Sequence, residues 1–61
     1  MNLKEVIEEK GMTVPIVANK MGINKTTLYR KIENNYFLVK DLILLKDILN
    51  LSQDDVENIF L

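Results

Sequence analysis

The chain of 61 residues contains no cysteine and no histidine, and it has only two glycines and one proline. Without cysteine no disulfide can form, and the lack of both residue types removes the soft metal ligands and the usual catalytic bases and nucleophiles. A chain without cysteine also fits a reducing compartment. No unbroken apolar run exceeds four residues, as in residues 42–45, so no membrane span or signal peptide is expected. These absences predict a cytoplasmic protein that is not an enzyme and holds no metal or cofactor.

A chain of this length has room for only a thin core. It buries about 60% of the surface that its unfolded form exposes. Small chains commonly gain stability from disulfides, a metal or a partner subunit, and the composition excludes the first two. We therefore expect one domain over residues 1–61, stabilised by well-capped helices and by self-association.

Charge is distributed unevenly along the chain, although the net charge is only −1. Residues 20–40 hold four lysines and one arginine against one glutamate, which gives +4. Residues 41–61 hold one lysine against four aspartates and one glutamate, which gives −4. A binding surface depends on its local field rather than on the total charge. Residues 20–40 are therefore the expected contact region for an anionic partner.

Helix starts are marked four times by the same pattern. An apolar residue precedes a capping residue, and a second apolar residue follows four positions after the cap, which is a hydrophobic staple. The four cases are Met1-Asn2 with Val6, Met12-Thr13 with Val17, Ile23-Asn24 with Leu28, and Leu51-Ser52 with Val56. With breaks at Gly11, Gly22 and Asn34-Asn35, the pattern predicts an all-α fold with helices over residues 3–10, 14–21, 25–33, 39–49 and 53–60. Tyr36 and Phe37 are expected in a connection that covers the core.

Two apolar stripes run along the helix predicted over residues 39–49. Four leucines at helical spacing form the expected core face: Leu38, Leu42, Leu45 and Leu49. Leu44 and Ile48 lie on a second stripe between charged residues. We predict that this second stripe is a homodimer interface, extended by Phe60 and Leu61 at the C-terminal end. The alternative is that the last helix folds back over the stripe within one chain.

Residues 14–32 have the spacing of two short helices joined by a tight turn. Apolar residues mark one face of each helix: Val17, Ala18 and Met21 in the first, Leu28 and Ile32 in the second. Gly22 can take the left-handed conformation that ends a helix. Ile23 is an apolar plug, and Asn24 caps the second helix. Two helices, a glycine turn and the small Ala18 where they cross describe a helix-turn-helix.

The run Ala18-x-x-Met21-Gly22-Ile23 followed by Leu28 resembles the small phage repressors and Cro-like proteins of the lambda-repressor-like, or XRE, family. The resemblance extends to the last two helices and implies a five-helix lambda-repressor-like domain. Two positions depart from the family pattern. Val14 stands where many relatives carry a glutamine that grips the DNA backbone, and Leu38 stands where relatives tend to carry a serine or threonine cap.

The resemblance implies that the second helix of the motif enters the major groove of DNA. The matching outward positions, which contact bases in Cro-like relatives, are Lys25, Thr26, Tyr29 and Arg30. Arg30 can pair with guanine through two hydrogen bonds; the alternative is a surface ion pair with Glu33. Lys25 can contact either a base or a phosphate, and the sequence does not favour one of them. Thr26 can contact a thymine methyl group or a phosphate. Tyr29 either faces the groove or lies back over the first helix of the motif.

Phosphate contacts are expected from helix termini and from nearby amines and amides. The start of the helix at Thr13 presents N–H groups that favour an anion. On the other side of the motif, a backbone clamp is expected from Lys31, Asn34, Asn35 and Lys40.

The resemblance thus implies a phage or bacterial Cro/repressor-type transcriptional regulator that binds double-stranded DNA as a homodimer. The alternative is a protein-interaction module on the same fold, such as an antirepressor or antitoxin, that grips a protein partner through the apolar fourth helix.

Overall fold

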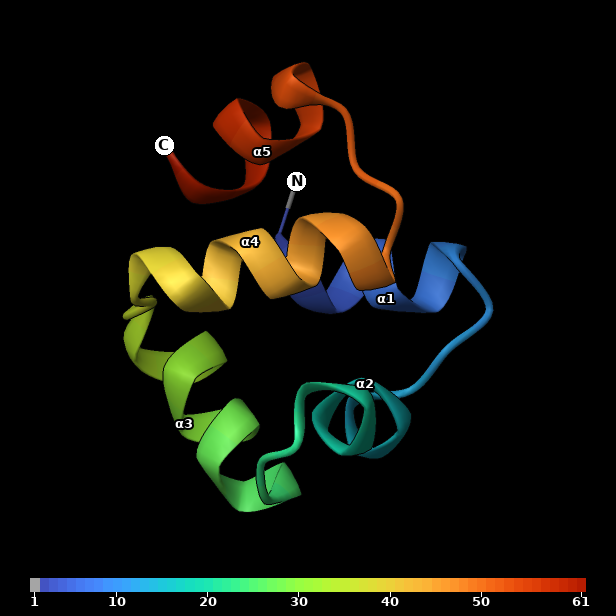
Figure 1. The fold of residues 1–61 in the computed structure, drawn as a ribbon, viewed down its shortest axis with the longest axis vertical. Helices are drawn as coiled ribbons and strands as arrows, with labels where there is room; N and C mark the ends of the chain where they lie inside the picture. The colour runs from blue at the N-terminus through green and yellow to red at the C-terminus, as the bar shows by residue number, and fades with distance from the viewer. Residues whose placement is uncertain (1) are drawn as a thin grey trace.

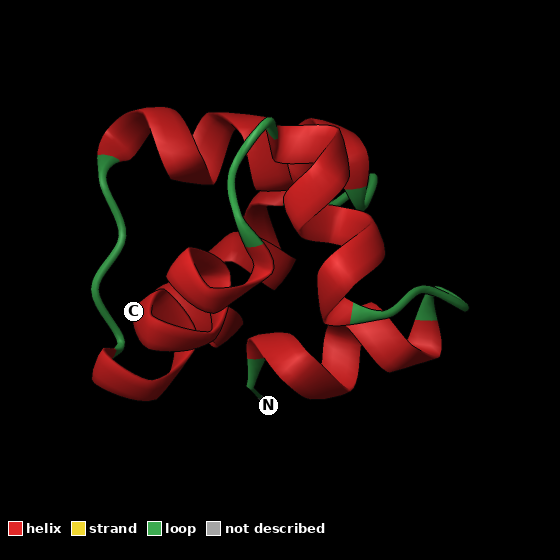
Figure 2. Cartoon of the chain, turned by 90° about the horizontal axis from the view of Figure 1, so that it is seen from below, coloured by secondary structure: helices red, strands yellow, loops and turns green. Residues whose placement is uncertain are grey.

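The computed structural model describes residues 2–61, which form five α-helices and no strand (Figures 1 and 2). The helices are α1 (Leu3–Glu9), α2 (Val14–Met21), α3 (Lys25–Asn34), α4 (Val39–Ile48) and α5 (Gln53–Phe60). The all-α prediction is confirmed, and each helix end lies within one residue of its predicted position. None of the five described helices is long and apolar enough to cross a membrane.

Side-chain caps hold the first turns of four helices. The side chains of Asn2, Thr13, Asn24 and Ser52 each accept a hydrogen bond from a backbone N–H of the helix that follows. At Ser52 the cap is reciprocal, because the Asp55 carboxylate also accepts a hydrogen bond from the Ser52 N–H at 3.0 Å. These caps satisfy N–H groups that have no partner within the helix. The staple predicted for α1 involves Met1, which lies outside the described residues.

Left-handed residues end the helices at the predicted breaks. Gly11 and Gly22 have φ values of 75° and 76°, and Asn35 has a φ of 50°. At the end of α2, the N–H groups of Gly22 and Ile23 donate to the carbonyls of Asn19 and Ala18 at 3.1 and 3.0 Å. This turn closes α2, and three residues separate the end of α2 from the start of α3. Asn34, predicted as a breaker, is instead the last residue of α3.

The core lies where α1, α2, α3 and α4 meet. Its most deeply buried large side chains come from all four helices and the residue after α4: Ile7, Val17, Leu28, Leu45 and Leu49. The small Ala18 is buried with them. In Figure 1, α4 runs across the middle of the molecule, with α2 and α3 below it and α5 above it. Helix α5 has no fully buried residue, but Val56, Ile59 and Phe60 pack against the core from the side.

Three predictions of burial need correction. Leu38 is the N-cap of α4 rather than a core residue, and its side chain is exposed. Tyr36 is exposed as well, so of the two aromatic residues in the connection only Phe37 packs against the core. Ile48 is half-buried against the core of its own chain, because α4 presents this part of its surface inward.

Phe60 is also held within the chain. Its ring meets the ring of Phe37 edge to face, with centroids 5.1 Å apart and an angle of 70° between the rings. Ile48 and Phe60 therefore do not form the free stripe that was predicted for a dimer. Leu44 and Leu61 are exposed as that prediction requires.

Candidate functional site

Helix α3 lies at the surface with only its inner side packed. Leu28 is fully buried, Ile32 and Lys31 are half-buried, and the other residues of the helix are exposed. The short turn from Gly22 to Asn24 joins α3 to α2, and α2 packs against both α3 and α4. The inner side of α3 packs against α2, and α3 lies at the edge of the molecule (Figure 1). We call its outer side the α3 ridge.

All four side chains predicted to contact bases are exposed on this ridge: Lys25, Thr26, Tyr29 and Arg30. Arg30 makes no ion pair with Glu33 within residues 2–61, so that alternative is not formed in this structure. A guanidinium on an open helix face keeps its N–H donors available to a planar acceptor pair.

Arg30 borders a shallow hollow of about 450 Å³ on one side of the ridge. Thr27, Lys31, Asn34 and Tyr36 line the rest of it. Positions 27, 30, 31 and 34 are three and four residues apart, so they share one side of the helix. The prediction missed Thr27 and Tyr36 as members of this group. For Thr27 the helical spacing from Arg30 and Asn34 was a usable signal.

Tyr29 faces a second hollow of about 330 Å³, on the side of the ridge toward the start of α2. Thr13 and Val14 at the start of α2 line this hollow, together with Lys4 and Glu8 from α1. The ring therefore neither faces fully outward nor lies back over α2. It is partly exposed on α3, and it borders the N-terminal end of α2.

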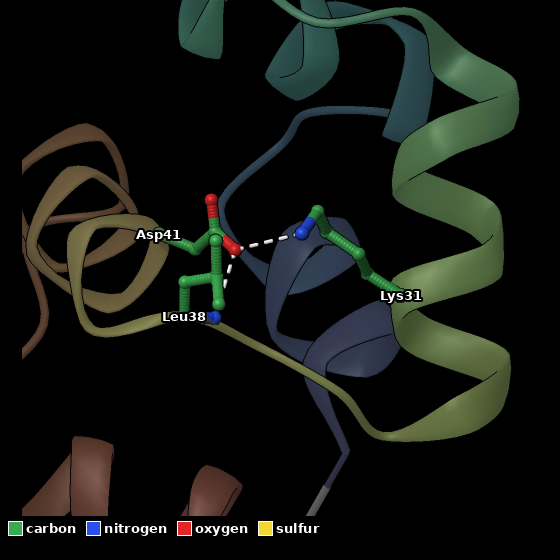
Figure 3. Close-up of polar contacts among 3 residues, drawn as sticks. All are labelled: Lys31, Leu38 and Asp41. Carbon is green, nitrogen blue, oxygen red and sulfur yellow. Dashed lines mark hydrogen bonds and ion pairs between the residues drawn. The ribbon is translucent and has the colours of Figure 1, made fainter.

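Lys31, which was predicted to contact phosphate, has a partner within the chain (Figure 3). Its Nζ lies 2.9 Å from Oδ2 of Asp41 on α4, and the same oxygen accepts a hydrogen bond from the Leu38 N–H at 2.9 Å. The Tyr36 ring lies over the ammonium group, with its centroid 5.9 Å away. In this structure the Lys31 ammonium is paired, and the pair joins α3 to α4.

Asp41 is the one charged residue among the described residues that is fully buried, with 4% of its surface exposed. Burial raises the pKa of its carboxyl group, but the hydrogen bonds from Lys31 and the Leu38 N–H and the positive charges of Lys31 and Lys40 outweigh burial. The net effect lowers its pKa. The ionised carboxylate also supplies one half of a capping box for α4 by accepting the Leu38 N–H, whereas Leu38 has no side-chain oxygen to accept a hydrogen bond in return.

The other residues predicted to contact phosphate are exposed but spread out. The Thr13 hydroxyl already accepts from the Ile16 N–H at 3.4 Å, and Asn35 forms the left-handed end of α3. Of the asparagines, only Asn34 shares the hollow with Arg30. Lys40 lies on α4 and makes no ion pair within residues 2–61.

No group of three or more acidic side chains within residues 2–61 could hold a metal ion. What the ridge offers is one guanidinium, a lysine at the helix start, hydroxyls, an amide and two phenol rings. These groups can donate hydrogen bonds, and the two rings can stack.

The chain matches no family model, no curated protein and no solved structure in comparisons of all three kinds.

Proposed function

We propose that this protein is a sequence-specific transcriptional regulator of the lambda-repressor-like, Cro/repressor type, which binds duplex DNA as a homodimer. In this proposal α2 and α3 form the helix-turn-helix, and α3 enters the major groove. The observation that carries the proposal is the open ridge of α3, which packs on α2 with its inner side and bears the exposed side chains of Lys25, Thr26 and Arg30.

The dimensions and chemistry of the ridge suit a major groove. A groove about 12 Å wide admits one α-helix with its side chains. Arg30 would read guanine through its O6 and N7 atoms, and Thr26 near the helix start would touch a base edge or a neighbouring phosphate. Asn34 lies on the same side as Arg30. Its amide is a second polar group that could contact a base edge or the DNA backbone.

Contacts to the DNA backbone would come from both sides of the ridge. On one side, the start of α2 carries Thr13 next to Tyr29. On the other side, Asn34 and Asn35 are exposed. Lys31 would act indirectly, because its ion pair with Asp41 sets the position of α3 relative to α4.

The second candidate is a protein-interaction module on the same fold. It is favoured by the apolar residues that α4 exposes, above all Val39 and Ile43. In that case α4 and not α3 would carry the function.

Selection from a random duplex library, followed by a salt titration, tests the proposal. We expect one enriched, roughly palindromic sequence, with half-site centres about 34 Å apart or a multiple of that distance. The logarithm of affinity should fall linearly with the logarithm of salt concentration, by about 0.9 for each phosphate neutralised. No enrichment, or an affinity that salt leaves unchanged, would contradict DNA binding and favour the protein-interaction module.

A further inference from the structure

The outward face of α4 carries two apolar residues between two opposite charges. Lys40, Ile43, Leu44 and Asp47 are spaced by three, four and seven residues, so they share one side of the helix. All four are exposed, with 65% of Ile43 and 40% of Leu44 open to solvent. Neither Lys40 nor Asp47 makes an ion pair within residues 2–61. We call these four residues the α4 face.

We propose that the α4 face binds the α4 face of a second copy of this chain, with the two helices antiparallel. A two-fold axis between positions 43 and 44 makes this face complementary to itself. Positions 40 and 47 lie at equal distances from that axis, so each Lys40 meets the partner's Asp47. The same symmetry packs each Ile43 beside the partner's Leu44. The result is an apolar centre with an ion pair at each end.

Charge complementarity selects this occupant and this orientation. In a parallel pair, Lys40 would face the partner's Lys40 and Asp47 would face the partner's Asp47, and like charges across an interface oppose binding. The antiparallel pair is isologous, which is the commonest symmetry of homodimers. A single helix face is smaller than the interface of a standard stable complex, so the dimer should be weak, with a dissociation constant in the micromolar range.

This interface differs from the stripe expected from the sequence. It keeps Leu44, replaces the half-buried Ile48 by Ile43, and does not use Phe60, whose ring packs on Phe37. The inference rests on the homodimeric part of the proposed function, but it does not depend on DNA binding.

Sedimentation velocity of the full chain without DNA, over a range of concentrations, tests the dimer. We expect the native sequence to shift from monomer to dimer across the micromolar range, and Ile43→Lys to stay monomeric with an unchanged circular dichroism spectrum. Ile16→Lys is the matched control, because Ile16 is also an exposed isoleucine but lies on α2. It should dimerise like the native chain. Leu61→Lys should also leave the dimer intact; loss of the dimer in that variant would place the interface at the C-terminus and overturn the proposal.

Charge exchange tests the antiparallel register. Lys40→Asp alone and Asp47→Lys alone should each weaken the dimer by about tenfold or more, because each places like charges together. The double variant restores both ion pairs with their directions reversed, and it should return the dissociation constant to within about threefold of the native value. A double variant as weak as the singles overturns the register.

The two proposals fail separately. A native chain that stays monomeric to millimolar concentration, or a dimeric Ile43→Lys variant, overturns the α4 interface even if the chain binds DNA. A dimer that Ile43→Lys abolishes supports the interface even if the salt titration shows no DNA binding.

Discussion

Arg30 and Lys31 are neighbours in the chain, but their surroundings give them different roles. The Lys31 ammonium is held by Asp41 and lies under the Tyr36 ring. The Arg30 guanidinium points outward and borders an open hollow. Both side chains border the same hollow, but only Lys31 has a carboxylate within reach, so its ammonium is paired while the Arg30 guanidinium makes no ion pair within residues 2–61.

Replacing Arg30 with alanine should therefore weaken binding to the selected DNA site without harming the fold. We expect a loss of about 1–3 kcal/mol, the value of one bidentate contact to a base. Lys46→Ala is the control, because it also removes one exposed positive charge but lies on α4. Fluorescence anisotropy gives the affinities and thermal melting checks the fold. Equal affinities for the native chain and Arg30→Ala would rule out Arg30 as a base contact.

Gly22 tests the turn between α2 and α3. Its φ of 76° is left-handed, and a Cβ placed there would meet no atom within 4 Å, so a substitution is penalised by backbone strain alone. Gly22→Val should lower the free energy of unfolding by on the order of 1–2 kcal/mol. Gly22→Asn should cost less, since Asn35 and Asn50 already adopt this conformation in the same chain. Urea unfolding measures both. Equal losses for the two variants would show that strain at this residue is not the cause.

At the scale of helices, the ion pair between Lys31 and Asp41 is the main polar connection between the proposed reading helix and α4. Asp41 Oδ2 accepts hydrogen bonds from both the Lys31 ammonium and the Leu38 N–H at the start of α4. The start of α4 and the position of α3 are thus coupled. Loss of the Asp41 charge should weaken both the start of α4 and the contact between α3 and α4.

Asp41→Asn should lower the free energy of unfolding by about 1.5–3 kcal/mol near neutral pH, the range for a hydrogen bond to a charged group. The pKa of the Asp41 carboxyl is lowered on folding from its ordinary value of 3.8. The stability from its charge is therefore fully present above that value and is lost as the pH falls through the lower folded pKa. The difference in the free energy of unfolding between the native chain and Asp41→Asn should disappear on acidification. Urea titrations from pH 7 to pH 2 measure this difference, and a difference independent of pH would refute the assigned role of the charge.

The helices themselves were predictable because their signals are local. The caps at Thr13, Asn24 and Ser52 and the turn at Gly22 depend on residues within four positions of one another. The exposure of Arg30 followed in the same way from the burial of Leu28. The pair of Lys31 and Asp41 was not predictable, because the two residues lie ten positions apart and meet only through the crossing of α3 and α4. The half-burial of Ile48 depends likewise on how α4 sits on the core.

At the scale of the whole molecule, α5 acts as a cover rather than as part of the core. None of its residues is fully buried, and the edge-to-face pair of Phe37 and Phe60 is one of its contacts with the rest of the chain. A domain of this size has a total stability of only several kcal/mol. Partly buried contacts in α5 therefore form a sizeable share of the total.

Phe60→Ala should lower stability by about 1–2 kcal/mol, from the lost burial of a half-buried ring and the lost aromatic pair. In a domain this small, each kcal/mol corresponds to about 4–8 °C in the melting temperature. Leu61→Ala is the control, because Leu61 follows directly and is almost fully exposed. Differential scanning calorimetry compares the two. If both variants melt like the native chain, α5 adds little to the stability of the fold.

The positions of the two tyrosines have a practical consequence. The chain has no tryptophan, and its only tyrosines are Tyr29 on α3 and Tyr36 just after it. Both are exposed, one in each hollow beside the α3 ridge, and the α4 face contains neither. All of the tyrosine emission of this protein therefore comes from the side on which DNA is proposed to bind. The intrinsic tyrosine fluorescence should therefore change when a ligand binds at α3, and it should change little when the chain self-associates through α4.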